Sequence, residues 1–298
     1  MYYLVYGFLY LLSLLPMWLL YGLSDAVRWL LFRVFGYRRK VVRDNLCIAF
    51  PEKTQKEREK IRREFEKNFT DTFIETIKLF SASREFIMKR MTGDFDKMSQ
   101  LYDRGLRCQV HMGHNFNWEW LNIAYGYYCK QPLLGVYMPL QNKVMDRIFL
   151  KLRSRTGTIL IPATDMRRQM MNHRSSIYLL GLVADQVPGS VQNAWWLNFF
   201  NRPSPFIWGP EKGAHAGDIP VAFAAIRKKK RGFYEVEIEV ATEHPSTLPM
   251  GTLTRSYRDF LERVIRRDPG MWLWSHRRWK HDWNPSYANN WIDTQPMP

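Results

Sequence analysis

One histidine and one glutamate stand out as residues that could do chemistry. His114 and Glu119 lie close together in the sequence, just after a short apolar run. Histidine can accept a proton near neutral pH, and a neighbouring carboxylate can fix its tautomer and stabilise the imidazolium. Such a pair can activate a hydroxyl or an amine for acyl transfer. Because this spacing often arises by chance, the pair needs support from the surrounding elements.

The residues around His114 predict a strand followed by a helix. The segment 107–111 has the composition of a strand, Gly113 lets the chain turn, and the segment 115–125 predicts a helix. Junctions of this kind lie at the edge of a sheet, where α/β proteins usually place their ligands. We therefore expect His114 and Glu119 to meet at such an edge.

Short β-branched runs alternate with helical stretches after Gly93, which indicates an α/β fold. The expected strands are 107–111, 134–137, 158–161, 177–184, 220–226 and 234–240. A late helix is expected at 252–267. We predict a mixed central sheet flanked by helices, formed by a catalytic region at 93–298 in a single domain with a helical region at 25–92.

The helical region contains two amphipathic helices, expected from Ser24 to about Phe35 and from Glu57 to Phe80. Thr54 and Glu57 form a capping-box pattern that marks the start of the second helix. Its aromatic and aliphatic residues recur at spacings of three and four. This stripe predicts a face that packs in the core.

Residues 1–24 carry no charged side chain, which is typical of a membrane segment. A helix of that length would reach about 36 Å, enough to cross a hydrocarbon core of ~30 Å. We predict a membrane anchor helix at 1–24, although Pro16 leaves a tilted or half-inserted helix open. Basic residues follow the segment, and they predict that the rest of the chain is cytoplasmic.

The net charge of +16 and the pI of about 9.8 favour anionic partners: nucleic acid, an acidic protein, a phosphorylated lipid or an anionic membrane surface. The three cysteines are widely spaced, so we expect reduced thiols rather than disulfides or a metal site. The histidines away from His114 have no metal-ligand spacing either. No metal is predicted.

Several blocks of this sequence resemble one family. Gly113-His114 and Asn117-Trp118-Glu119 resemble the His-four-residues-Glu motif of the late lipid A acyltransferases, the lauroyl and myristoyl transferases of the lysophospholipid acyltransferase-like superfamily. Further blocks that resemble this family, in the same order along the chain, are 38–51, 153–157, 185–189, 199–203 and 268–280. The resemblance therefore covers nearly the whole chain.

The resemblance implies a glycerolipid acyltransferase-like fold and an enzyme on the cytoplasmic face of the inner membrane. It implies transfer of a fatty acyl chain from acyl carrier protein, less commonly from acyl-coenzyme A, to a hydroxyl of a lipid A precursor. His114 would be the general base and Glu119 its orienting partner. No cofactor is expected beyond the acyl donor as co-substrate.

The candidate substrate-binding residues are Asn117, Arg153, Arg155, Asp185 and Gln186. The two arginines could hold a phosphate bidentately, or they could be solvated surface residues. Asp185 could orient the acceptor or Arg153, or it could be a turn residue before Pro188.

Positions 115 and 116 depart from the family motif, which often has Phe and Gly where this chain has Asn115 and Phe116. This departure leaves the acyl chain length and the acceptor open. One alternative is therefore an acyltransferase that acts on another lipid, such as a lysophospholipid, an aminolipid or a glycolipid.

A second alternative is a non-catalytic basic protein that binds a membrane or nucleic acid. The uncharged N-terminal segment argues against nucleic acid, so no nucleic acid partner is expected. The basic run 227–232 predicts a hairpin tip that is either solvated or docked on a membrane. The tryptophans around 276–280 favour cation-π packing of the C-terminal segment near the membrane.

Overall fold

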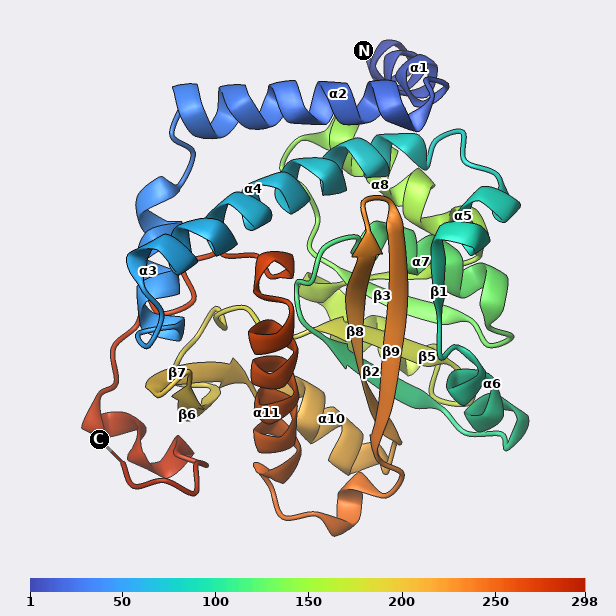
Figure 1. Cartoon of the computed structure of the whole chain (residues 1–298). Helices are drawn as coiled ribbons and strands as arrows, with labels where there is room; N and C mark the ends of the chain where they lie inside the picture. The colour runs from blue at the N-terminus through green and yellow to red at the C-terminus, as the bar shows by residue number, and fades with distance from the viewer. Residues whose placement is uncertain (298) are drawn as a thin grey trace.

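Within residues 1–297, which the computed structural model describes, seven strands form a central sheet in the order β1-β9-β8-β2-β5-β3-β4 (Figure 1). Strands β8 and β9 run antiparallel, and the other neighbouring pairs are parallel. The strands are β1 (Met91–Gly93), β2 (Cys108–Met112), β3 (Leu133–Tyr137), β4 (Ile159–Pro162), β5 (Leu179–Val183), β8 (Val221–Lys230) and β9 (Phe233–Thr242). The predicted mixed sheet and its six predicted strands are confirmed.

Helices surround this sheet and include the helix predicted at 252–267. Figure 1 shows α2 lying along α4 across one end of the sheet, with the tip of the β8–β9 hairpin just beneath them. The helices are α1 (Tyr2–Ser13), α2 (Met17–Arg28), α3 (Arg39–Ala49), α4 (Gln55–Lys78), α5 (Arg84–Arg90), α6 (Asp96–Asp103), α7 (Trp118–Tyr128), α8 (Lys143–Arg153), α9 (Met166–Met171), α10 (Gly209–Gly217) and α11 (Thr252–Arg267).

The long helix α4 begins as the sequence predicts. The Thr54 hydroxyl accepts a hydrogen bond from the backbone N–H of Glu57, and the Glu57 carboxylate accepts one from the Thr54 backbone N–H at 2.7 Å. Phe65 and Phe69 of the predicted stripe are buried, whereas Phe73 is half exposed. The packing face of α4 therefore covers the core over only part of its length.

The single helix predicted over residues 1–24 is not formed. α1 ends at Ser13, α2 starts at Met17 after Pro16, and α2 continues as a π-helical segment at Trp29–Val34. Proline lacks a backbone N–H and clashes with the preceding turn, so the chain restarts a helix after it. Among residues 1–297 no single helix is long and apolar enough to span a bilayer; α1 and the extended α2 meet these criteria together but are bent by 116°.

A second, two-stranded sheet was not predicted. It consists of β6 (Ala194–Phe199) and β7 (Arg202–Ile207), which pair antiparallel. The two residues between them, Phe200 and Asn201, both have positive φ angles, as a tight hairpin turn of this length requires. Two prolines within β7 argue against a strand in the sequence, and a strand at the edge of a small sheet is where proline is tolerated.

Candidate active site

His114 lies two residues beyond the carboxyl end of β2, the strand at the middle of the sheet. Its neighbour Gly113 packs so closely that a Cβ atom there would lie 2.7 Å from the Leu261 side chain and 3.3 Å from an Asp185 carboxylate oxygen. A larger residue at this position would therefore have to displace Leu261 and crowd Asp185. This confirms the predicted strand-to-helix junction, with α7 beginning at Trp118.

Asp185 reaches the same point from the neighbouring strand. β5 pairs with β2 in parallel, with Met112 opposite Val183, and the Ala184 N–H donates to the Met112 carbonyl at 3.0 Å. His114 and Asp185 therefore each lie two residues beyond paired positions of adjacent parallel strands. Because the carboxyl ends of parallel strands meet at one edge of a sheet, this register brings the two side chains together.

The carboxylate of Asp185 holds His114 by two hydrogen bonds. The Nδ1 atom of His114 lies 2.5 Å from Asp185 Oδ1, and the His114 backbone N–H donates to Oδ2 at 2.8 Å. The His114 side chain is partly exposed, whereas that of Asp185 is buried. A carboxylate accepts, so Nδ1 carries the proton and the lone pair of Nε2 is left to act as a base.

Trp272, in the segment after α11, completes the surroundings of Asp185. Its indole N–H donates to Asp185 Oδ2 at 2.6 Å. Burial alone would raise the pKa of Asp185, but the charge and hydrogen bonds of His114, together with Trp272, outweigh it and hold that pKa below its usual value. The aspartate is therefore ionised at neutral pH and can stabilise a protonated His114.

Gln186 and His276 lie next to this pair. The side-chain amide of Gln186 is 3.1 Å from His114 Nε2, and the backbone N–H of Val187 donates to His276 Nε2 at 3.2 Å. Burial lowers the pKa of His276 to about 4, and nearby Arg278 acts in the same direction. His276 is therefore neutral, and it fixes the loop that carries Asp185 and Gln186.

The hydrogen bond to His114 was predicted for Glu119 and is made instead by Asp185. Glu119 is buried near the start of α7, where its carboxylate pairs with the guanidinium of Arg153. The Arg153 Nε atom donates to both carboxylate oxygens at 3.1 and 3.0 Å, and the Trp118 indole N–H donates to one of them at 3.2 Å. The charge of Glu119 is thus already balanced by a cation.

Two further candidate side chains also find their partners inside the protein. Asn117 is buried and donates to Glu75 of α4 at 2.7 Å. Arg155 donates to the backbone carbonyls of Leu79 and Ala82, the latter at 2.6 Å. Arg153 is partly exposed beside Glu119. The structure therefore brings Gln186, Asp185 and His114 together and gives the other candidates separate structural contacts.

The closing basic segment packs in the core, and the expected cation-π contact is made with phenylalanines. Arg278 is fully buried, and its guanidinium lies over the rings of Phe206 and Phe199, 4.4 and 5.1 Å from their centroids.

The basic hairpin 227–232 is only partly solvated, because Arg231 and Lys228 bind side chains of α4. In the part of the chain described, no group of three or more potential ligands could hold a metal.

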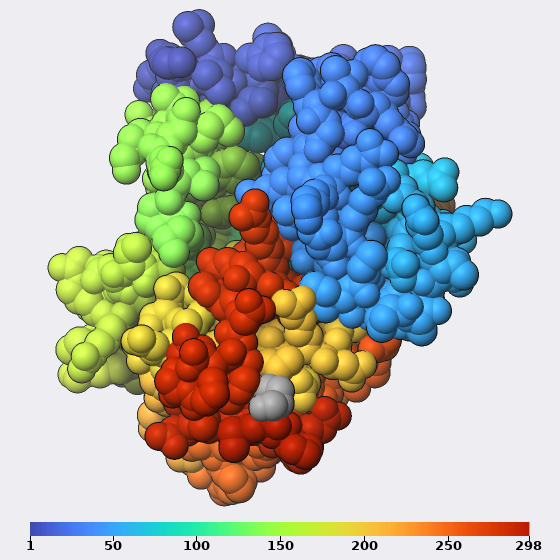
Figure 2. All heavy atoms as spheres, turned by 90° about the vertical axis from the view of Figure 1, so that its left-hand side faces the viewer, coloured from blue at the N-terminus to red at the C-terminus, as the bar shows by residue number. Residues whose placement is uncertain are grey.

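The N-terminal segment formed by α1, α2, the residues between them and the π-helical segment exposes many large apolar side chains. They are Tyr3, Leu4, Phe8, Tyr10, Leu11, Leu14, Leu15, Trp18, Leu19, Leu23, Val27, Trp29, Leu30, Val34 and Phe35. Figure 2 shows the surface hollowed between these N-terminal helices, in blue, and the green segment that contains α8. An apolar surface of this extent beside a hollow is typical of proteins that meet a membrane or an apolar ligand.

The roles of Trp272 and His276 at this site were missed, and so was the contact between Asp185 and His114. Asp185 follows an apolar run, as His114 does, and that shared position was the available signal. The order of the strands in the sheet was needed to turn it into a contact. Trp272 is brought to the site by a bridge between its backbone and that of Asn115, which the sequence alone does not indicate.

The fold and site together define an α/β protein with a histidine-carboxylate pair at the carboxyl edge of its parallel strands. The chain belongs to the bacterial lipid A biosynthesis acyltransferase family, which it matches over residues 1–281. It is 24% identical over 277 residues to a protein of Haemophilus influenzae named lipid A biosynthesis acyltransferase, covering 89% of this chain and 86% of the relative. Both comparisons support an acyltransferase.

Proposed function

We propose that this protein transfers a fatty acyl chain from acyl carrier protein, or from acyl-coenzyme A, to a hydroxyl of a lipid A precursor. The observation that carries the proposal is the pairing of His114 with Asp185 at the sheet edge, within a chain of this family. A histidine whose Nδ1 is held by a buried carboxylate presents a basic Nε2 to a substrate.

His114 is the general base in this mechanism. Its Nε2 takes the proton of the acceptor hydroxyl while that oxygen attacks the carbonyl carbon of the acyl thioester. The new C–O bond forms, the C–S bond breaks, and the leaving thiolate takes the proton back from the imidazolium. Asp185 stabilises the imidazolium through Nδ1, and the Gln186 amide leaves Nε2 when the hydroxyl binds.

Glu119 acts through Arg153 in this proposal. The ion pair joins the start of α7 to the end of α8 and so holds the helix that follows His114. Arg153 is partly exposed, so its guanidinium can also contact a phosphate of the acceptor. Arg155, bound to two carbonyls, supports the scaffold instead of the substrate.

The exposed apolar faces of α1 and α2 are consistent with helices that lie in the interface of the inner membrane, on its cytoplasmic face. The net charge of +16 favours binding to anionic lipids, to phosphorylated acceptors and to an acidic acyl carrier protein. The hollow beside α8 is where we propose that an acyl chain enters (Figure 2).

The test is mass spectrometry of lipid A from a strain that lacks the gene, complemented with either the wild type or His114→Ala. We expect the deletion to remove one acyl chain from lipid A, the wild type to restore it and His114→Ala to leave it missing. An unchanged lipid A profile in the deletion strain would contradict this acceptor. The same extracts then report whether another lipid has lost its acyl chain.

A further inference from the structure

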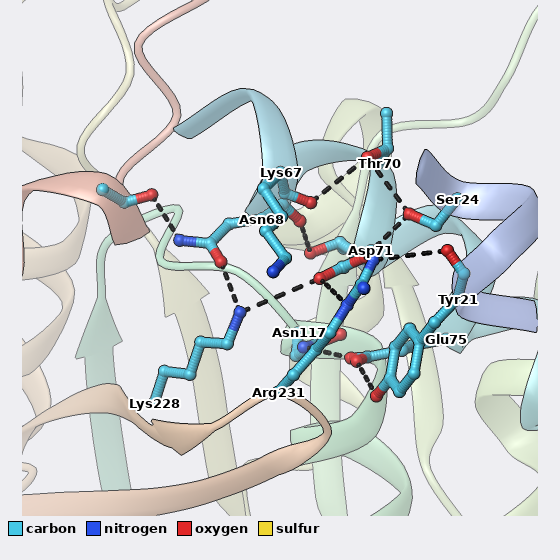
Figure 3. Close-up of polar contacts among 12 residues, drawn as sticks. Tyr21, Ser24, Lys67, Asn68, Thr70, Asp71, Glu75, Asn117, Lys228 and Arg231 are labelled. Carbon is cyan, nitrogen blue, oxygen red and sulfur yellow. Dashed lines mark hydrogen bonds and ion pairs between the residues drawn. The ribbon is translucent and has the colours of Figure 1, made fainter. Parts of the chain in front are cut away.

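A buried polar cluster lies between α4, the N-terminal helix α2 and the tip of the β8–β9 hairpin (Figure 3). Its centre is Glu75 of α4, whose carboxylate accepts three hydrogen bonds. Tyr21 of α2 donates to Oε1 at 2.7 Å, while Asn117 and Tyr234 donate to Oε2 at 2.7 and 2.8 Å. The Trp120 indole also donates to the Glu75 carbonyl at 2.9 Å.

Burying Glu75 costs free energy, because its carboxylate loses its contact with water. It is fully buried, and its three side-chain partners are neutral donors with no cation among them. Burial raises the pKa of Glu75 to about 7, the nearby charge of Asp71 acts in the same direction, and the donors oppose it. A buried carboxyl group that has only neutral donors carries a desolvation cost that an apolar core residue does not. The three hydrogen bonds of Glu75 instead tie together α2, the residue before α7 and β9.

The residue that Glu75 holds at the active site is Asn117. Asn117 precedes α7 within the stretch from His114 to Glu119, and it adopts the left-handed conformation with φ of 72°. This conformation is uncommon for residues other than glycine, and asparagine is among those that tolerate it best. Asn117 makes no side-chain bond to the helix that it precedes. Its amide is bound to Glu75 instead.

The turn at Asn117 determines how the chain passes from His114 into α7. On the side of His114 the loop is held by the Phe116 N–H, which donates to the Met271 carbonyl at 3.1 Å. On the side of α7 the Leu121 N–H donates to the Asn117 carbonyl at 3.0 Å. The Glu75 bond holds the residue between these two, so it helps fix the loop that carries His114.

The other end of the cluster belongs to the apolar surface. Tyr21 lies on α2, one helical turn from the exposed Trp18 and close to the exposed Leu23. The same helix binds α4 at a second place, where the Ser24 hydroxyl donates to Asp71 at 2.7 Å. Arg231 of the hairpin joins Asp71 to Asp25 of α2 by ion pairs of 2.6 and 3.0 Å. The helix with the apolar face is thus bonded directly to the cluster.

We infer that Glu75 is a positioning residue, and that the chain of hydrogen bonds Tyr21–Glu75–Asn117 couples the seating of α2 on α4 to the loop that carries His114. When α2 is seated, Tyr21 fixes the Glu75 carboxylate and the carboxylate fixes Asn117. When α2 leaves, Glu75 loses one of its three donors, and its restraint on Asn117 weakens. This inference rests on the proposed function for its effect on turnover, but not for the coupling itself.

Two hydroxyl deletions on α2 make a matched pair. Tyr21→Phe removes the bond to Glu75, whereas Ser24→Ala removes the bonds to Asp71 and Thr70, neither of which is hydrogen-bonded to Asn117. Each variant removes one hydroxyl that anchors α2 on α4. We expect Tyr21→Phe to lower kcat by about 3- to 10-fold with KM for the acyl donor changed less than about twofold, and Ser24→Ala to change kcat by less than about twofold.

Hydrogen exchange measured on the full-length protein in detergent micelles gives a readout independent of activity. Tyr21→Phe should speed exchange of the amides at 116–121, and Ser24→Ala should leave them at the wild-type rate. Equal effects of the two variants, or none from Tyr21→Phe, would overturn the coupling. If the wild-type protein transfers no acyl chain, but Tyr21→Phe still speeds exchange at 116–121 and Ser24→Ala does not, the proposed function is refuted and the coupling is supported.

A double-mutant cycle tests the step through Asn117. Asn117→Gly keeps the left-handed turn without needing a side-chain bond, because glycine adopts positive φ freely. We expect Glu75→Gln to lower kcat by about tenfold in the wild-type background and by less than about threefold in the Asn117→Gly background. Equal losses in both backgrounds, with thermal midpoints showing that all four proteins fold, would show that Glu75 does not act through Asn117.

Discussion

Two buried carboxylates, those of Asp185 and Glu119, were candidates for the partner of His114, and they bind different groups. Asp185 accepts hydrogen bonds from the His114 ring, the His114 backbone and Trp272. Glu119 accepts its bonds from Arg153 and Trp118. Arg153 always carries a positive charge, whereas His114 gains one when it takes a proton.

This difference determines which of the two carboxylates can stabilise a protonated histidine. Arg153 already balances the charge of Glu119, so this carboxylate would stabilise a second cation only weakly. Asp185 is ionised, buried and paired with a group whose charge changes during turnover. A carboxylate stabilises a transient imidazolium best when no permanent cation already neutralises it. We therefore propose that Asp185 is the carboxylate that takes part in the reaction and that Glu119 has a structural role.

The largest effect on activity is expected at His114. His114→Ala removes the base and should lower kcat by about 10³- to 10⁴-fold, because general-base catalysis is lost while the fold remains. The loss of kcat is measured by transfer of a radiolabelled acyl chain from acyl carrier protein to a lipid A precursor. Circular dichroism is the control for folding. Turnover within tenfold of the wild type would remove His114 from the mechanism.

Asp185→Asn is expected to have the next largest effect. The amide has nearly the shape of the carboxylate but cannot stabilise the imidazolium and offers Nδ1 a donor, so kcat should fall by about 10²- to 10³-fold. The comparison with Glu119→Gln under the same assay is decisive. If Glu119→Gln costs more activity than Asp185→Asn, then Glu119 and not Asp185 is the partner of His114 during turnover.

Glu119→Gln is expected to act mainly on stability. It leaves Arg153 partly buried without its counter-charge, which should cost about 2 to 3 kcal/mol of unfolding free energy, while kcat stays within about tenfold. Unfolding by urea in detergent measures it. The double variant Glu119→Leu with Arg153→Met should recover most of the loss, since it removes both charges. A double variant as unstable as the sum of its single changes would argue against an isolated ion pair.

The smallest effect on activity is expected at His111, which extends the comparison to a histidine with no carboxylate. Burial lowers the pKa of His111 to about 3 from an ordinary value of 6.5. Below pH 6.5 the unfolded chain binds a proton that the folded protein does not, so stability falls as the pH falls and the loss continues down to about pH 3. By pH 5 this should amount to about 2 kcal/mol.

His111→Gln should therefore remove about 2 kcal/mol of the difference in unfolding free energy between pH 7 and pH 5, with kcat at pH 7 within about twofold of the wild type. Urea unfolding of both proteins at the two pH values checks this. The same pH dependence in the variant and the wild type would mean that His111 is protonated in the folded protein.

The sequence was sufficient for six of the seven strands of the central sheet, because each of these is a short apolar run bounded by turn residues; the three-residue strand β1 was missed. The capping box of Thr54 and Glu57 is local, so it too could be read directly. The partner of His114 could not, because proximity along the chain favoured Glu119 while the parallel register of β2 and β5 selects Asp185. Contacts that depend on strand order are not encoded in local spacing.

The N-terminal helix and the cluster at Glu75 show the same limit. An uncharged stretch has the composition of a spanning helix whether or not it is broken, so composition did not give the 116° bend across the break at Pro16. Glu75 lies on a part of α4 where most side chains are buried. Its three donors come from α2, from the residue before α7 and from β9, which no window of sequence contains.

The sequence separations in this cluster have a consequence for how the chain is made. The partner of Tyr21, Glu75, is synthesised 54 residues later, and the partner of Asp25, Arg231, is synthesised 206 residues later. During translation the first helices are therefore made before the residues that will hold them. The inner face of α2 cannot be seated until the hairpin that carries Arg231 has been made, so this cluster is completed late in folding.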